Sequence, residues 1–122
     1  MSYVRDEGRL KLQSLRDTLL QWWSVKKELP AGKAGPTPAV PCSSAPDHLC
    51  RIETGWYSDP IWRLLDFEVT EPDHFQYTYE SDGRVACATA VGDPECTGAR
   101  VELVLTFDTR GPFTKSMIME QL

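Results

Sequence analysis

Apolar residues in the first 28 positions recur at the three- and four-residue spacing of an amphipathic helix. The apolar stripe consists of Val4, Gly8, Leu12, Leu15, Leu19 and Trp22. Most of the charged residues fall on the remaining faces of this helix. Pro30 and Gly32 follow the stripe, and both residue types end helices. The sequence therefore predicts one long helix over residues 1–28.

Segment 29–57 is rich in proline and glycine, and we expect a loop without helix or strand, fastened by cysteines. Its prolines are Pro30, Pro36, Pro38, Pro41 and Pro46. A short helix is predicted over 58–66, where Asp59 offers a polar cap and Pro60 occupies the first helical position. Ile61, Leu64 and Leu65 would form its apolar face.

After residue 74 the apolar spacing changes to the two-residue period of β-strands. Phe75, Tyr77 and Tyr79 alternate with polar residues, and Asp82 with Gly83 is typical of a hairpin turn. Four strands are predicted over 74–80, 84–91, 99–108 and 113–122. The expected fold class is α+β. A single domain over 1–122 packs its long N-terminal helix on a four-stranded antiparallel sheet over 74–122.

Length and charge limit the possible functions. A chain of 122 residues suffices for one core. A net charge of -5 argues against nucleic acid as a partner. The charge is uneven, because residues 1–28 carry six Lys and Arg against four Asp and Glu. No stretch has the roughly 18 apolar residues of a membrane span, and the first residues lack the apolar core of a signal peptide.

Four cysteines, Cys42, Cys50, Cys87 and Cys96, are typical of an oxidising compartment. Three pairings are possible, and we favour the local one, which joins Cys42 to Cys50 and Cys87 to Cys96. Because disulfides imply export and no export signal is visible, we expect the native chain to begin upstream of Met1.

Residues with catalytic or metal-binding chemistry are few. His48 and His74 lack a nearby nucleophile and orienting acid, so we expect no enzyme, no catalytic residue and no cofactor. The alternative metal site would be a zinc site made of Cys42, Asp47, His48 and Cys50. Its cysteines are further apart than the two to four residues usual in structural zinc sites, so we expect no metal.

The stretch from Trp56 to Tyr79 resembles type IV pilin-like proteins of the deltaproteobacterial or myxobacterial type. The similarity lies in the Trp-x-x-Leu-x-Phe run from Trp62 to Phe67 and in the strand ending Tyr-x-Tyr at Tyr79. The resemblance implies the globular part of a type IV pilus or pseudopilus subunit, in some relatives a minor subunit at the tip or in priming. It also implies an apolar half-helix upstream that anchors the subunit in the inner membrane before assembly. The protein would then be located in the periplasm or in the extracellular pilus, and its partners would be other pilin or pseudopilin subunits.

If the chain assembles in this way, complementary charges on neighbouring heads would set their register. The expected basic patch is Arg5, Arg9 and Arg16, with Lys26 and Lys27. The expected acidic patch is Glu68, Glu71 and Asp73. An ordinary solvated surface would carry the same charges.

A second hypothesis keeps the fold but makes it a secreted adhesive or carbohydrate-binding head. In that case Trp56 and Tyr57 would be exposed and would stack on a sugar. The alternative places such aromatic residues in the core, where large apolar side chains are usually found.

Overall fold

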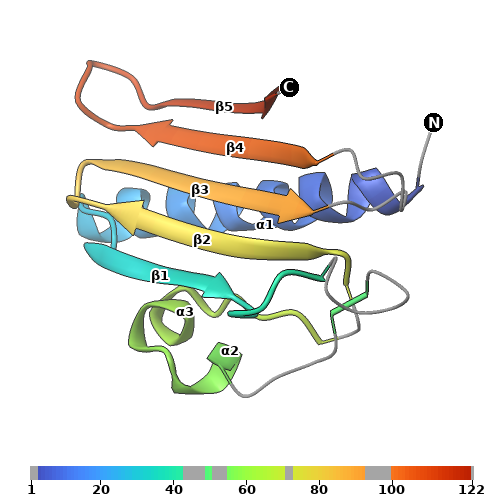
Figure 1. Ribbon diagram of the computed structural model, residues 1–122. Coiled ribbons are helices and arrows are strands. Elements are labelled where there is room, and N and C mark those ends of the chain that lie inside the picture. Colours follow the sequence, from blue (N-terminus) through green and yellow to red (C-terminus); the bar gives the residue numbers. More distant parts are fainter. Residues whose placement is uncertain (1–2, 43–48, 51–54, 71–72, 93–99, 122) are drawn as a thin grey trace.

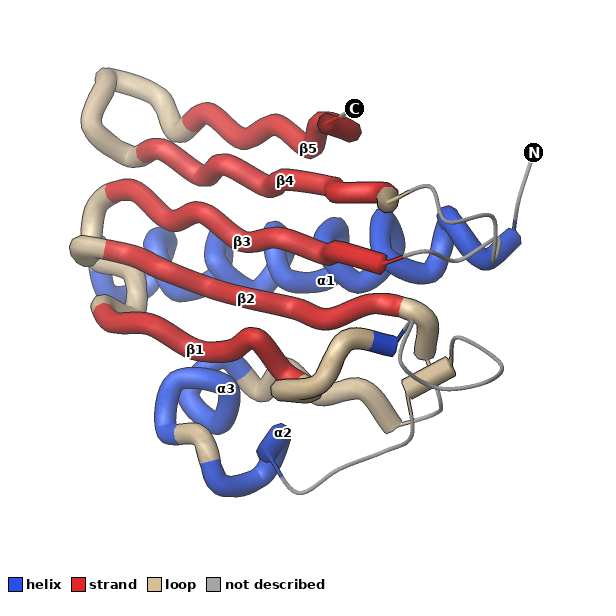
Figure 2. The backbone as a smooth tube through the Cα atoms, in the orientation of Figure 1, coloured by secondary structure: helices blue, strands red, loops and turns tan. Residues whose placement is uncertain are grey.

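The computed structural model describes residues 3–42, 49–50, 55–70, 73–92 and 100–121. A long helix, α1 (Tyr3–Lys26), packs across one face of an antiparallel sheet, and in Figure 2 it lies behind the sheet. The strands follow one another in space as they do in sequence (Figure 1). They are β1 (Gly32–Thr37), β2 (Phe75–Ser81), β3 (Val85–Gly92), β4 (Val101–Asp108) and β5 (Lys115–Gln121). Two short helices, α2 (Gly55–Ser58) and α3 (Pro60–Leu65), lie beside β1.

The prediction of four strands is wrong, because the sheet has five. The additional strand is β1, which lies inside the segment predicted as a loop. It pairs antiparallel with β2 from Gly32 to Ala34, and the register then shifts before Thr37. This segment is rich in proline and glycine, so its composition did not indicate a strand. Proline lacks a backbone N–H, but an edge strand such as β1 tolerates it because one side of the strand needs no partner.

The core lies between α1 and the sheet. Leu12, Leu15 and Leu19 are almost fully buried, and each lies on the stripe that the sequence predicts. Opposite them are the inward residues of the strands, namely Phe75, Tyr77, Tyr79, Ala86, Ala88, Ala90, Val101, Leu103, Leu105 and Phe107. The small side chains of β3 let α1 approach closely. At Gly8 an added Cβ atom would lie 3.2 Å from the Cβ atom of Ala90.

An aromatic cluster joins α2 and α3 to the sheet. The Trp56 ring lies 5.2 Å from the Trp62 ring and 5.6 Å from the Phe67 ring, measured between centroids. The indole N–H of Trp62, which is fully buried, donates to the Thr37 hydroxyl at 2.9 Å. This hydrogen bond connects α3 to β1. Asp59 caps α3 by accepting from the backbone N–H groups of Ile61 and Trp62.

In the part of the chain that the structure describes, no helix combines the length and apolar character required to span a membrane.

Candidate interaction surfaces

Helix α1 reaches further than the sheet that it covers. Its 24 residues span about 36 Å at 1.5 Å per residue, whereas an eight-residue strand such as β3 spans about 27 Å. Figure 1 shows its N-terminal end extending past the ends of β3 and β4. Gly8 is the first buried residue of α1 among those described. The turn before Gly8 therefore lies at the margin of the packed core.

Among the described side chains of α1, three large apolar ones are exposed, namely Val25 in its last turn, which is 77% exposed, and two leucines on its outward face. Leu10 is 62% exposed and Leu20 is 49% exposed. Both lie away from the stripe of Leu12, Leu15 and Leu19, so neither contributes to the core of this chain. The outward face can therefore pack against another apolar helix without unfolding the head.

The predicted basic patch is divided. Lys26 lines the groove beside α3, Lys27 follows α1 and lies over the Trp23 ring, and only the arginines share one flank of α1. Arg9 and Arg16 are half-buried, and at helical spacing they share this flank with Arg5, whose side chain lies outside the described residues. The opposite flank, with Ser14, Thr18 and Gln21, borders a groove against α3. Because α3 lies beside β1, the arginine flank is turned toward the other edge of the sheet, formed by β5. The weak contact of Arg16 with Asp17, at 3.8 Å, leaves its charge available.

The predicted acidic patch does not form a surface, because Asp73 is buried. Only 5% of Asp73 is exposed. One carboxylate oxygen accepts from the backbone N–H of Phe75 and the other from the hydroxyl of Tyr77, each at 2.9 Å. Glu68 is half-buried after α3, and Glu71 lies outside the described residues. Asp73 thus contributes to the fold, and its charge is not presented to a neighbouring head.

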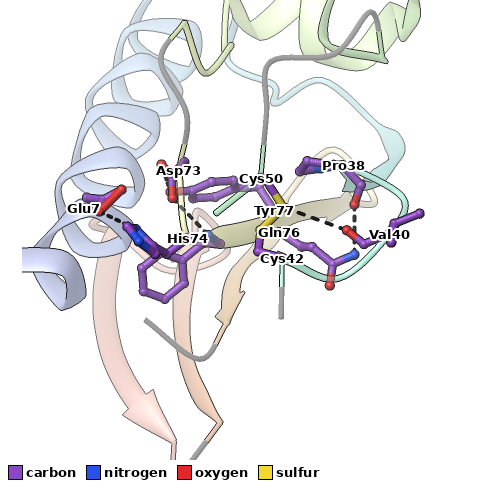
Figure 3. Close-up of a disulfide and its surroundings, with 10 residues drawn as sticks. Glu7, Pro38, Val40, Cys42, Cys50, Asp73, His74, Gln76 and Tyr77 are labelled. Carbon is purple, nitrogen blue, oxygen red and sulfur yellow. Dashed lines mark hydrogen bonds and ion pairs between the residues drawn. A yellow bond between two sulfur atoms is a disulfide. The ribbon is translucent and has the colours of Figure 1, made fainter. Parts of the chain in front are cut away.

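Asp73 belongs to a polar cluster at the start of β2 (Figure 3). Burial, together with the nearby charge of Glu7, raises the pKa of Asp73 to about 6, although the hydrogen bonds from Tyr77 and Phe75 oppose the shift. Burial also raises the pKa of Tyr77 well above its ordinary value. His74 Nδ1 lies 2.9 Å from a carboxylate oxygen of Glu7. This contact links the first turns of α1 to the beginning of β2.

The disulfide between Cys42 and Cys50 confirms one predicted pair. Cys50 also forms a β-bridge with Asp73, so the disulfide lies beside the polar cluster, as Figure 3 shows. Backbone hydrogen bonds connect Cys50 and Asp73 in both directions. The end of the proline-rich segment is therefore attached to the start of β2 by covalent and hydrogen bonds.

The second predicted pair does not form in the structure, because Cys87 has a free thiol. Cys87 lies within β3, where Glu80 and Thr106 flank it on the neighbouring strands, rather than in a turn. Burial raises the pKa of the Cys87 thiol, and the carboxylates of Glu80 and Glu102 raise it further. Cys96 lies outside the described residues. The pair was predicted from the short spacing between Cys87 and Cys96. That spacing does not show that Cys87 belongs to a regular strand.

The expectation that Trp56 is exposed is wrong. Its side chain is 3% exposed and packs in the aromatic cluster, so its ring is not free to stack on a sugar. Tyr57 is 53% exposed and borders a shallow depression with Arg63, Asp66 and Glu68. The carbohydrate hypothesis therefore loses one of its two aromatic residues.

The proposed zinc ligands do not form a site. Cys42 and Cys50 are joined in a disulfide and cannot bind a metal as thiolates. Asp47 and His48 lie outside the described residues. Across the residues with described positions, no three His, Cys, Asp or Glu side chains gather into a group that could hold a metal ion.

The chain matches no protein family, no curated protein and no solved structure. Its function is therefore inferred from its own residues and their arrangement. Sequence reasoning did not anticipate the contact between Glu7 and His74, or that β5 forms the outer edge of the sheet in the described part of the chain. The first joins residues 67 positions apart, and no local pattern could indicate it. The second follows from strand order, which the alternating pattern alone does not specify.

Proposed function

We propose that the chain is the globular head of a type IV pilin-like or pseudopilin subunit that assembles through α1 and through contacts between heads. The observation that carries the proposal is the division of α1 into two faces. One face, with Leu12, Leu15 and Leu19, is buried on the sheet. The other keeps Leu10 and Leu20 exposed along a helix that extends past the strands.

A subunit of this kind needs a helix that packs on its own head with one face and on neighbouring subunits with the other. Burial of one face fixes the head on the helix, and the exposed apolar residues on the other face suit packing against helices of neighbouring subunits. The amino end of α1 would continue into an apolar segment, which anchors the subunit in the inner membrane before assembly. The head would then lie in the periplasm and later on the extracellular pilus.

Of the charged contacts predicted from sequence, we retain only those made by the arginine flank of α1. Arg9 and Arg16 would meet an acidic surface on a neighbouring subunit, but that surface does not include Asp73, which is buried. Such contacts set register and reject wrong neighbours more than they add affinity. The adhesive alternative has only Tyr57 as an exposed aromatic residue of its predicted pair, so we favour assembly.

The proposal is tested in cells that express the full-length gene product, by measuring the share of the protein found in filaments sheared from the surface. Leu10→Lys and Leu20→Lys each place a charge where helices would pack. We expect the share in filaments to fall about tenfold, which corresponds to about 1.4 kcal/mol. Leu64→Lys is the matched control, because Leu64 is 52% exposed but lies on α3.

Two results would contradict the proposal. One is absence of the unmodified protein from sheared filaments in cells that assemble them. The other is equal incorporation of the Leu10→Lys, Leu20→Lys and Leu64→Lys proteins. Urea unfolding of each purified protein checks that none of the substitutions disrupts the head, as expected for side chains that are at least 49% exposed.

A further inference from the structure

The two edges of the sheet differ in how open they are to another strand. At the β1 edge, Pro36 lacks a backbone N–H, the register shifts between Ala34 and Thr37, and α3 contacts the strand. Lys33 adds an exposed charge there. Prolines, irregular register, charges and covering elements all hinder the addition of a further strand. The β1 edge is therefore protected.

The β5 edge has none of these protections in its central residues. It pairs with β4 in continuous register from Lys115 to Gln121, without a bulge or a proline. Within the described residues, no strand pairs with its outer side. Lys115 and Glu120 stand near its ends, and the three central residues are apolar. A regular edge whose central residues are uncharged is a template for strand addition.

The two faces of the β5 edge offer different chemistry. Met117 and Met119 are 58% and 50% exposed, and they lie on the open face of the sheet opposite Thr106 and Val104. Ile118 points to the other face and packs partly against the core. A strand added beside β5 would place alternate side chains on these two faces. Its residues on the open face would contact methionine, which favours apolar partners.

The face on the α1 side carries Glu120 of β5, on the same side as Ile118, together with arginines of α1. Helix α1 contacts β5, and its arginine flank, with Arg9 and Arg16, is turned toward this edge. Acidic side chains on the inner face of an added strand would therefore be attracted. In an antiparallel pair of two copies joined through β5, the two arginine flanks would face each other on the same side of the sheet. Like charges disfavour that arrangement.

We propose that β5 binds an extended segment of another protein by strand addition. The segment alternates apolar side chains, which cover Met117 and Met119, with acidic side chains, which face Arg9 and Arg16. This inference goes beyond the proposed function and does not depend on filament assembly. A single added strand buries less than the roughly 1,600 Å² of a standard interface, so the affinity of an isolated segment is modest.

The first experiment uses synthetic peptides of about ten residues, longer than β5 itself, with the purified chain. One peptide alternates valine with glutamate, a second alternates valine with lysine, and a third has the composition of the first with its valines grouped together. Fluorescence anisotropy should show binding of the first peptide about tenfold tighter than that of the other two. Hydrogen exchange should slow at backbone amides of β5 when the first peptide binds.

The second experiment separates the edge from general charge effects. Met117→Glu and Met119→Glu each place a negative charge on the open face at the edge, and each should weaken binding of the valine–glutamate peptide at least about tenfold. Thr106→Glu is the matched control, because Thr106 is exposed directly opposite Met117 but lies on β4. We expect it to reduce binding less. Arg9→Gln with Arg16→Gln should remove the preference for glutamate over lysine and retain the folded state.

Several results would overturn the inference. No measurable binding, equal binding of the alternating and grouped peptides, or binding without protection of β5 would each do so. If Thr106→Glu weakened peptide binding as much as Met117→Glu, net charge alone would explain the loss of binding. Sedimentation of the chain alone as a dimer that Met117→Glu dissociates would assign the edge to a second copy instead of an acidic segment.

Discussion

Replacing Asp73 with asparagine should make the head more stable at neutral pH. Asp73 is 5% exposed, and burial raises its pKa from 3.8 to about 6. In the unfolded chain the carboxyl group ionises near its ordinary pKa. Between these two values the folded protein retains a proton that the unfolded chain releases, so the free energy of unfolding falls as the pH rises. Asparagine cannot ionise, and its amide oxygen can still accept the hydrogen bond from the backbone N–H of Phe75.

The size of the effect follows from the two pKa values. At about 1.4 kcal/mol per pKa unit, the ionised form of Asp73 costs about 3 kcal/mol above pH 6 relative to the protonated form. About 2 kcal/mol of this cost develops between pH 4.5 and 7.5. The side chain is nearly inaccessible to solvent, so screening by water reduces the cost little. For a domain of this size, whose stability is about 5 to 15 kcal/mol, such a change is easily measured.

Urea unfolding followed by tryptophan fluorescence, at pH 4.5 and 7.5, measures this difference. The unmodified protein should lose about 2 kcal/mol more than Asp73→Asn over the interval. Asp82→Asn is the control, because Asp82 is exposed and backbone N–H groups of Arg84 and Val85 lower its pKa. Asp82 stays ionised throughout the interval, so the Asp82→Asn substitution should leave the pH dependence unchanged. Parallel curves for the unmodified and Asp73→Asn proteins would refute the reasoning.

Three further substitutions test the packing by urea unfolding. Gly8→Ala brings a Cβ atom to 3.2 Å from that of Ala90, and we expect a net loss of up to about 2 kcal/mol after a gain of about 1 kcal/mol in helix propensity. A stabilised Gly8→Ala protein would show that α1 can move away from β3. Thr37→Val leaves the buried indole N–H of Trp62 without its acceptor and should cost about 1 to 3 kcal/mol, whereas Thr37→Ser should restore most of it. Equal losses for valine and serine would exclude the hydrogen bond as the cause. Cys42→Ser opens a disulfide whose cysteines are 8 residues apart and should cost about 2 to 3 kcal/mol. A reducing agent should destabilise the unmodified protein equally and the Cys42→Ser protein no further, and a further loss in the variant would contradict this.

The sequence was most informative where structure depends on near neighbours. The spacing of Leu12, Leu15 and Leu19 predicts the buried face of α1, because helical periodicity places these residues on one side whatever they pack against. The alternation of Phe75, Tyr77 and Tyr79 indicates in the same way which side chains of β2 face the core. Asp59 followed by Pro60 predicts the start of α3 from capping chemistry alone.

Features that depend on distant partners could not be predicted. β1 is a strand because β2 offers it backbone partners, and its own composition indicates a loop. Asp73 looks like a surface charge in a polar segment, and only the approach of Cys50 and Tyr77 shows that it is buried. Trp56 beside Tyr57 gives no periodic signal, because α2 has only four residues.

These distant contacts also determine which surfaces remain free for partners. β1 and α3 close one edge of the sheet, and the Trp62 to Thr37 hydrogen bond holds them together. Asp73, the disulfide and the contact of His74 with Glu7 fasten the start of β2 to the neighbouring segments. With that edge occupied by the chain itself, the exposed apolar side chains of β5 and the outward face of α1 become the surfaces through which another protein can bind with little cost to the core. Leu10 and Leu20 of α1 face away from Met117 and Met119 of β5, but both proposals use Arg9 and Arg16. An acidic neighbouring head and an acidic added strand would therefore compete for these two arginines.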